Sequence, residues 1–265
     1  MSAVAFALVL ASAFLHASWN ARTNADDDRA PQLALMYTTG AVVLAPWLVA
    51  DPPTEALGFV LLSGLAHGGY LLFLSQAYAR GGLATTYPLA RGTAPLLVAV
   101  VGIWLLDQTP SVPTLAGAVA VGVGLVVIGG VAWGRGERVA MAMALVTGCF
   151  IASYTLIDAR AVRETGELGF FAAASLVAAA VVLVGSRPSP TRLRRAIRPG
   201  ITVGLFSTAA YALVLLAYQR ADAANVATLR GVSILIGLFL VRRTVTPRIV
   251  FGSCCVVAGA GLVVA

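Results

Sequence analysis

The residues of this sequence that could do chemistry are few, and they lie within apolar segments. Arg91 and Arg230 each interrupt a long apolar run. An arginine near the middle of a membrane-spanning helix costs roughly 2.5–3.5 kcal/mol on insertion scales, so it needs a reason to persist. A guanidinium group carries a planar fork of donors that suits a carboxylate or a phosphate. The two arginines therefore predict either a site for an anionic or zwitterionic substrate, or groups that hold freed backbone carbonyls and helix ends.

Both histidines also lie within apolar segments, each with polar or aromatic neighbours on one helical face. His16 is followed by Trp19 and Asn20 at helical spacing, and His67 is followed by Tyr70. A polar stripe on a membrane-spanning helix faces protein rather than lipid. These residues indicate either the wall of a substrate cavity, with a histidine as a proton or substrate contact, or ordinary hydrogen bonds between helices.

Tyrosines and one acid extend this set of candidates. Tyr211 and Tyr218 are spaced to share a face of one segment, as are Tyr154 and Asp158 of another. Tyrosine hydroxyls beside a cavity suit polar organic substrates, whereas tyrosines near a helix end form the aromatic belt at the membrane surface. Asp158 is a candidate for proton coupling. The alternative, which the sequence favours, is an ion pair with Arg160 or Arg163.

The composition indicates that membrane-spanning helices position these residues. Apolar residues make up 59% of the chain and charged residues only 11%, against about 45–50% and 25% in soluble domains. The mean hydropathy is +0.90. So few charges could not cover the surface of a soluble protein. The chain is therefore predicted to be an all-α polytopic membrane protein, with the lipid bilayer as its surroundings.

Ten segments are long enough to cross a bilayer as helices, which takes about 20 apolar residues each. They are predicted at residues 3–20, 32–50, 57–78, 83–106, 113–133, 139–158, 168–185, 199–219, 223–241 and 247–265. The connecting loops are too short to hold a soluble catalytic domain. They also make nucleic acid a poor partner, although the net charge is +7.

All 18 basic residues are arginine, and their placement predicts the orientation in the membrane. Thirteen arginines fall in the loops on one side, three on the other side, and two within spans. The positive-inside rule places the side with thirteen arginines in the cytoplasm, so that both termini face outward.

The chain also repeats itself. Ala77-Tyr78-Ala79-Arg80 recurs as Ala217-Tyr218-Gln219-Arg220, and Arg91-Gly92 recurs as Arg230-Gly231. The repeat divides the chain into residues 1–135 and 136–265, with five spans each. Because five is odd, the second half enters the membrane from the opposite side. The predicted architecture is ten transmembrane helices as two inverted five-helix repeats, which is typical of secondary transporters with a site near the midplane.

Pairs of glycines at GxxxG spacing support helix packing in lipid. They are Gly64 with Gly68 on the third span and Gly200 with Gly204 on the eighth. Small residues allow two helix backbones to approach closely. We expect close packing at these pairs, with a hinge for substrate gating as the alternative.

Local motifs resemble a known family. They are His16-Ala17-Ser18-Trp19-Asn20-Ala21, Tyr87-Pro88-Leu89-Ala90-Arg91-Gly92-Thr93-Ala94-Pro95 and Tyr154-Thr155-Leu156-Ile157-Asp158. With the five-plus-five repeat, they resemble the EamA-like branch of the drug/metabolite transporter superfamily. The resemblance implies ten helices around a cavity lined by spans 1, 3, 4, 6, 8 and 9. It also implies movement of small metabolites, mostly as exporters, and it adds Tyr87 to the candidate binding residues.

This sequence departs from the family in two ways. Members often have Glu just after the fourth and ninth spans, where this chain has Asp107 and the pair Arg242-Arg243. Members are also usually drawn with both termini in the cytoplasm, whereas the arginine distribution predicts the reverse.

The predicted function is a secondary transporter that moves a small polar metabolite across the cytoplasmic membrane, without a cofactor or metal. The substrate would be amino-acid-like, an organic anion or a zwitterion, and export is the expected direction. The alternatives are a polytopic membrane enzyme or an accessory membrane subunit. The sequence has no HExxH or GxSxG motif and no ATP-binding loop, so we expect no enzyme. The protein is expected to be a monomer or a homodimer.

Overall fold

The computed structural model describes residues 1–24, 29–81, 83–130, 135–240 and 244–264. These residues form helices joined by short connections, with no β-strand among them. In chain order the helices are α1 (Ala3–Asn24), α2 (Arg29–Val43), α3 (Ala45–Ala50), α4 (Leu57–Gly81), α5 (Leu83–Leu105), α6 (Val112–Gly129), α7 (Arg135–Ala161), α8 (Glu167–Ser186), α9 (Pro190–Tyr218), α10 (Ala223–Leu229), α11 (Val232–Leu240) and α12 (Pro247–Val264). A 3-10 turn, Thr54–Ala56, precedes α4.

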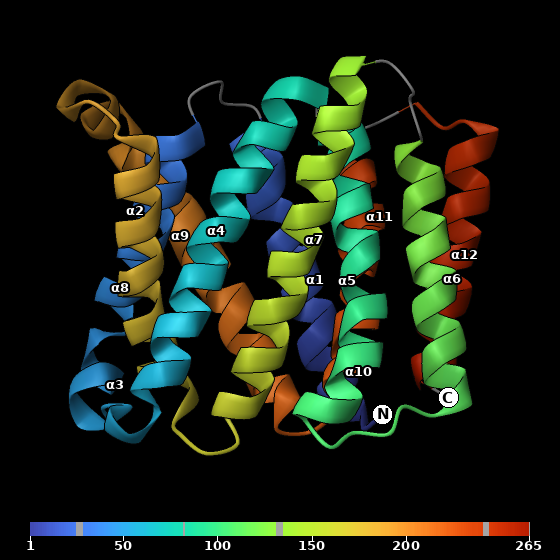
Figure 1. The fold of residues 1–265 in the computed structure, drawn as a ribbon, viewed down its shortest axis with the longest axis horizontal. Helices are drawn as coiled ribbons and strands as arrows, with labels where there is room; N and C mark the ends of the chain where they lie inside the picture. The colour runs from blue at the N-terminus through green and yellow to red at the C-terminus, as the bar shows by residue number, and fades with distance from the viewer. Residues whose placement is uncertain (25–28, 82, 131–134, 241–243, 265) are drawn as a thin grey trace.

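The long helices run alternately up and down, side by side, and both termini lie at the lower end of the bundle (Figure 1). Nine helical segments of the described chain are long and apolar enough to cross a membrane, with α10 and α11 counted together. A further crossing is made by α2 and α3, which descend one after the other (Figure 1). The protein is therefore a polytopic all-α membrane protein, as the composition predicts.

Two of the predicted spans are broken helices rather than continuous ones. The second span breaks after Val43, where Pro46 sits in the first turn of α3. The ninth span breaks at Arg230 and Gly231, between α10 and α11. Proline explains the first break, because it cannot donate the backbone hydrogen bond that would continue α2. The second break places Arg230 at the end of a half-helix inside the bundle.

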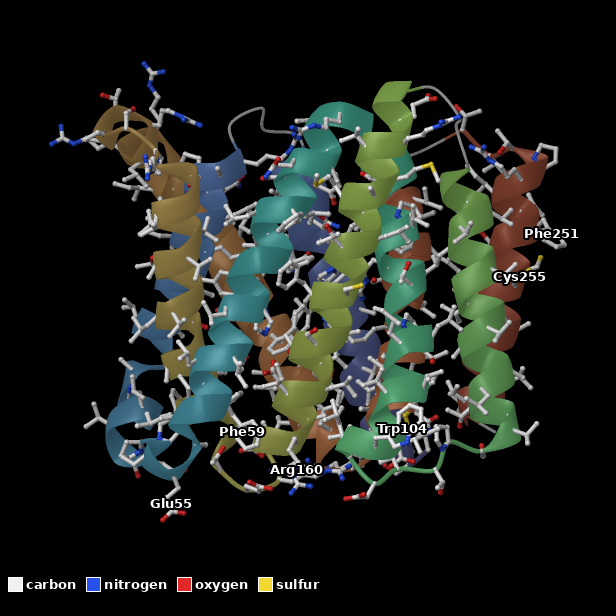
Figure 2. The ribbon with its side chains drawn as sticks, in the orientation of Figure 1. Glu55, Phe59, Trp104, Arg160, Phe251 and Cys255 are labelled. Carbon is white, nitrogen blue, oxygen red and sulfur yellow. The ribbon has the colours of Figure 1, made fainter. Side chains whose placement is uncertain are left out.

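Helices α1, α2, α4, α5, α7, α8, α9 and α10–α11 pack against one another and form the larger part of the bundle. Helix α4 packs on α7 and α8, and α9 packs on α1 and α2. Helices α6 and α12 pack on each other at one edge (Figure 1). Phe251 and Cys255 lie on the outer side of α12 (Figure 2), and the Phe251 side chain is exposed. Exposed apolar side chains of this kind form the surface that lipid covers.

The predicted GxxxG pairs lie at close helix contacts. A Cβ atom added at Gly64 would meet Val177 and the Ala174 main-chain oxygen of α8. A Cβ atom added at Gly204 would meet Thr39 and the Met36 main-chain oxygen of α2. The same holds for Gly68 against α8 and for Gly200 against α2. The expectation of close packing is confirmed at all four glycines.

Candidate functional site

A cavity lies inside the bundle where the candidate residues from several helices converge. Its wall is formed by His16, Trp19, Met36, Tyr37, His67, Tyr70, Tyr154, Phe171, Ser207, Ala210, Tyr211 and Arg230. The space open to the centres of water-sized molecules is about 30 Å³, which suffices for about two waters. The walls must therefore move apart before a metabolite can enter.

His67 on α4 is the centre of a hydrogen-bond network between four helices. Its Nδ1 atom is 2.9 Å from the Tyr37 hydroxyl on α2. Its Nε2 atom is 3.0 Å from Asp158 Oδ2 on α7. The ring of Tyr154, also on α7, stacks on the imidazole with a centroid separation of 4.0 Å. The histidine is thus fixed in position and direction from both ring nitrogens and from one face.

Asp158 does not make the ion pair that the sequence favours. The carboxylate is fully buried, accepts a 2.5 Å hydrogen bond from the Tyr211 hydroxyl on α9, and also contacts His67. Arg160 instead pairs with Glu164 one turn later, at 2.9 Å, and Arg163 is exposed. The expected pairing of Asp158 is wrong because Asp158 faces the bundle, whereas Arg160 lies at the lower surface of the molecule (Figure 2).

Arg230 brings a positive charge to the cavity wall. Its side chain is buried, and its guanidinium carbon lies 5.5 Å from the centre of the Tyr211 ring. None of the ion pairs formed by the described residues involves Arg230. The break between α10 and α11 lets the arginine leave the helix surface and point its guanidinium group at the cavity.

Arg91 lies beside Arg230 but has a different environment. One of its terminal guanidinium nitrogens donates to the main-chain oxygen of Arg230 at 3.3 Å. That oxygen faces the helix break, where it also accepts from the backbone N–H of Ser233. Arg91 is buried on α5 and is outside the set of residues that line the cavity. Of the two arginines, only Arg230 lines the cavity, whereas Arg91 donates to a backbone carbonyl at the helix break.

The first helix contributes a second group of candidates. His16 Nε2 is 2.6 Å from the Tyr87 hydroxyl on α5, and its ring packs edge to face with Trp19 at 4.8 Å. The Trp19 indole N–H is buried without a hydrogen-bond partner. Tyr87 and Asn20 lie beside each other just behind the cavity wall. Among the candidates that the sequence predicts, seven line the cavity: His16, Trp19, His67, Tyr70, Tyr154, Tyr211 and Arg230.

Several wall residues were missed. Tyr37 and Met36 come from α2, Phe171 from α8, and Ser207 and Ala210 from α9. The resemblance implies a wall from spans 1, 3, 4, 6, 8 and 9, but α2 and α8 also contribute, and α5 stays behind the wall. Tyr37 carried a usable signal, since it is a tyrosine well inside a long apolar segment. Phe171, Met36 and Ala210 carried none, because such residues are common in any span.

The interior of the described chain has more positive than negative charge. Its buried arginine and acidic residues are Arg91, Arg230 and Asp158, beside the two buried histidines. A buried charge without a counter-ion is costly in a low-dielectric interior. An anionic group at the cavity would offset this excess. Within the described part of the chain, no group of three or more His, Cys, Asp or Glu residues is arranged to hold a metal ion.

Comparisons with known proteins agree with this geometry. The model of the EamA-like transporter family matches residues 138–265, which confirms the resemblance over the second half of the chain. A solved crystal structure is similar to the whole chain with a TM-score of 0.75, at 17% identity over 99% of this chain and 96% of that one. No curated protein matches the sequence significantly. The likeness to the solved structure shows the fold, and the family match over residues 138–265 suggests a membrane transporter of the drug/metabolite type.

Proposed function

We propose that this chain is a secondary transporter that exports a small carboxylate-bearing metabolite, either an organic anion or a zwitterion, across the cytoplasmic membrane. The substrate-binding residues of the proposal are those of the cavity wall, with Asn20 and Tyr87 behind it. The observation that carries the proposal is the position of Arg230. A buried guanidinium group at a helix break, facing a cavity, is arranged to bind an anionic group.

The chemistry of Arg230 favours a carboxylate over a neutral substrate. The guanidinium group presents paired donors that match the two oxygens of a carboxylate. Its charge has no acidic partner among the ion pairs of the described residues. A bound carboxylate would supply that partner and offset the cost of burying the charge.

The rest of the wall favours a substrate with an apolar body. Tyr70, Tyr154, Phe171 and Trp19 present aromatic rings to the cavity. Small-molecule sites commonly combine such apolar walls with a few polar groups that fix orientation. The hydroxyls of Tyr70 and Tyr154 add hydrogen-bonding groups. A small metabolite with one charged end and an apolar side chain fits this wall better than a sugar or a polyphosphate.

The arrangement of helices supports alternating access by two related halves, residues 1–135 and 136–265. Helix α4 contacts α7 and α8 in the way that α9 contacts α1 and α2, and α5 contacts α7 as α11 contacts α1. Such reciprocal contacts are expected of an inverted repeat and support this proposal. The cavity lies between the proposed halves, which is where transporters of this architecture place their sites. Export is the direction that the resemblance to the EamA-like family implies.

The proposal is tested with purified protein in two steps. A thermal-shift screen of amino acids, mono- and dicarboxylates, organophosphates, sugars and aromatic cations comes first. We expect stabilisation by compounds that carry a carboxylate, with the uncharged amides of the same compounds inactive. The stabilising compounds are then measured in counterflow with proteoliposomes. Stabilisation confined to sugars or cations would contradict the proposal, and so would binding without counterflow.

A further inference from the structure

We infer that Asp158 and His67 form a proton-exchange site, in which Asp158 binds the ammonium group of a zwitterionic substrate in place of a proton held by His67. The carboxylate of the same substrate binds Arg230. This inference rests on the proposed function, since it needs a substrate carboxylate at Arg230.

Asp158 has an unused acceptor. Its Oδ2 atom accepts from the Tyr211 hydroxyl and contacts His67 Nε2, whereas its Oδ1 atom is buried without a hydrogen-bond partner. A buried carboxylate oxygen without a donor costs free energy, and a positively charged donor offsets most of that cost. An ammonium group supplies three N–H donors and the opposite charge. The cavity must widen to admit any metabolite, and Asp158 contacts two of its wall residues, Tyr211 and His67.

The hydrogen-bond partners of His67 can serve either a neutral or a protonated imidazole. In the neutral form Nε2–H donates to Asp158, and Nδ1 accepts from the Tyr37 hydroxyl. In the protonated form Nδ1–H donates to the same tyrosine oxygen, because a hydroxyl can donate or accept. The Tyr154 ring, stacked at 4.0 Å, also favours a cation over its face. His67 can therefore gain or lose a proton without a change in its hydrogen-bond partners.

The titratable and charged groups around the pair Asp158 and His67 come from several helices packed against α7 and α4. They are His67 of α4, Tyr37 of α2, Tyr87 and Arg91 of α5, Tyr154 of α7, Tyr211 and Tyr218 of α9, and Arg230 at the break between α10 and α11. Phenol and guanidinium groups exchange protons less readily near neutral pH than imidazole and carboxylate groups do. We therefore assign the exchanged proton to the pair formed by His67 and Asp158, which are in direct contact.

Tyr211 joins this pair to the carboxylate site. Its ring lies beside the Arg230 guanidinium group, with 5.5 Å between the guanidinium carbon and the ring centre, and its hydroxyl donates to Asp158 at 2.5 Å. The Arg230 guanidinium group and the Asp158 carboxylate thus contact the same side chain, that of Tyr211, at its ring and at its hydroxyl. An α-amino acid carries its carboxylate and ammonium groups on one carbon atom. Such a molecule, lying along the Tyr211 ring, can present one charge to Arg230 and the other to Asp158.

The exchange follows from charge. A protonated His67 and a substrate ammonium group would place two cations on one carboxylate, so each disfavours the other. When the zwitterion binds from the cytoplasm, the proton leaves His67 for water on that side. When the zwitterion leaves on the outer side, His67 takes up a proton there. One proton enters for each neutral zwitterion exported, and one positive charge moves inward per cycle.

The first test uses the wild-type protein in detergent micelles. Leucine and phenylalanine are compared with their deaminated counterparts, 4-methylpentanoate and 3-phenylpropionate, by calorimetry in buffers of different ionisation enthalpy. We expect the amino acids to release up to one proton per molecule bound. Their affinity then falls by up to tenfold per pH unit toward acid. The deaminated acids, which lack the ammonium group, release none.

The second test uses variants. Asp158→Asn should abolish proton release and lower amino-acid affinity to that of the deaminated acid, while the deaminated acid still binds. Glu164→Gln is the matched control, because Glu164 is an exposed acid near the same end of α7. If Asp158→Asn fails to fold, His67→Gln is expected to remove proton release while the amino acid still binds.

The outcomes separate this inference from the function on which it rests. If no carboxylate binds the wild-type protein, the proposed function itself fails. If each amino acid and its deaminated counterpart bind equally and neither releases protons, the proposed carboxylate site stands and the proton-exchange site is overturned. Proton release that persists in Asp158→Asn also overturns it.

Discussion

The guanidinium group of Arg91 donates to the main-chain oxygen of Arg230 at 3.3 Å, although the two residues are 139 positions apart. Both side chains are buried in the bundle. The contact gives the two arginines different tasks. Arg91 is a second donor, beside the Ser233 backbone N–H, to the Arg230 carbonyl at the helix break, whereas the Arg230 guanidinium group lines the cavity. The helix break, the Arg91 hydrogen bond across it and the Arg230 guanidinium group form one structural unit.

Arg91→Gln should therefore act on stability. The substitution removes a charged hydrogen bond to a buried carbonyl, which is worth about 1.5–3 kcal/mol. We expect a lower apparent melting temperature in detergent, measured by intrinsic fluorescence, with the affinity for substrate weakened only through the altered break. Arg198→Gln, which removes an exposed arginine, serves as the control. A melting temperature equal to that of the control would show that the hydrogen bond from Arg91 does not stabilise the fold.

Close helix packing predicts opposite results at two glycines. A methyl group at Gly204 would meet the side chain of Thr39 and the backbone of Met36, whereas at Gly237 it would meet nothing within 4 Å. Gly204→Ala should cost about 1–3 kcal/mol through overpacking. Gly237→Ala should be neutral or stabilising, because alanine is the better helix former by about 1 kcal/mol. Thermal unfolding in detergent measures both, and equal shifts would contradict the packing.

The orientation in the membrane is tested by cysteine labelling. Cys149, Cys254 and Cys255 are first replaced, since all three are free thiols. If the side with thirteen arginines is cytoplasmic, Thr191→Cys should resist an impermeant thiol reagent in intact cells. Val264→Cys, at the other end of the bundle, should react. Permeabilised cells provide the control that both positions can be labelled. The reverse pattern would restore the orientation usual for the family and contradict the arginine argument.

Much of the fold follows from the sequence because lipid imposes strong constraints. Length and apolarity locate the spans, and the rarity of arginine in lipid identifies the pair Arg91 and Arg230. The break at Arg230 was not predicted, since neither Arg230 nor Gly231 prevents a helix from continuing. The proline Pro46 offered a signal for the other break, which the long apolar run of residues 32–50 obscured.

The site was predicted only in part, because the spacing of residues along one helix does not show which residues they contact on other helices. His16, His67 and Tyr211 were found as polar residues in apolar surroundings. The partner of Asp158 was misjudged, because Arg160 and Arg163 are close in sequence while His67 is 91 positions away. Tyr37 was missed although it holds the second nitrogen of His67. Tertiary contacts, rather than residue types, decide which of these groups meet.

Arg230→Gln, measured in counterflow, tests the central claim most directly. Proteoliposomes loaded with an unlabelled carboxylate from the thermal-shift screen take up the labelled compound from outside, and wild type, Arg230→Gln and Arg198→Gln are compared at equal amounts of folded protein. We predict that Arg230→Gln keeps its melting temperature but raises the apparent KM at least tenfold or abolishes uptake, while Arg198→Gln behaves as wild type. Uptake by Arg230→Gln at the wild-type KM would contradict the account, because the cavity would then bind its substrate without the guanidinium group.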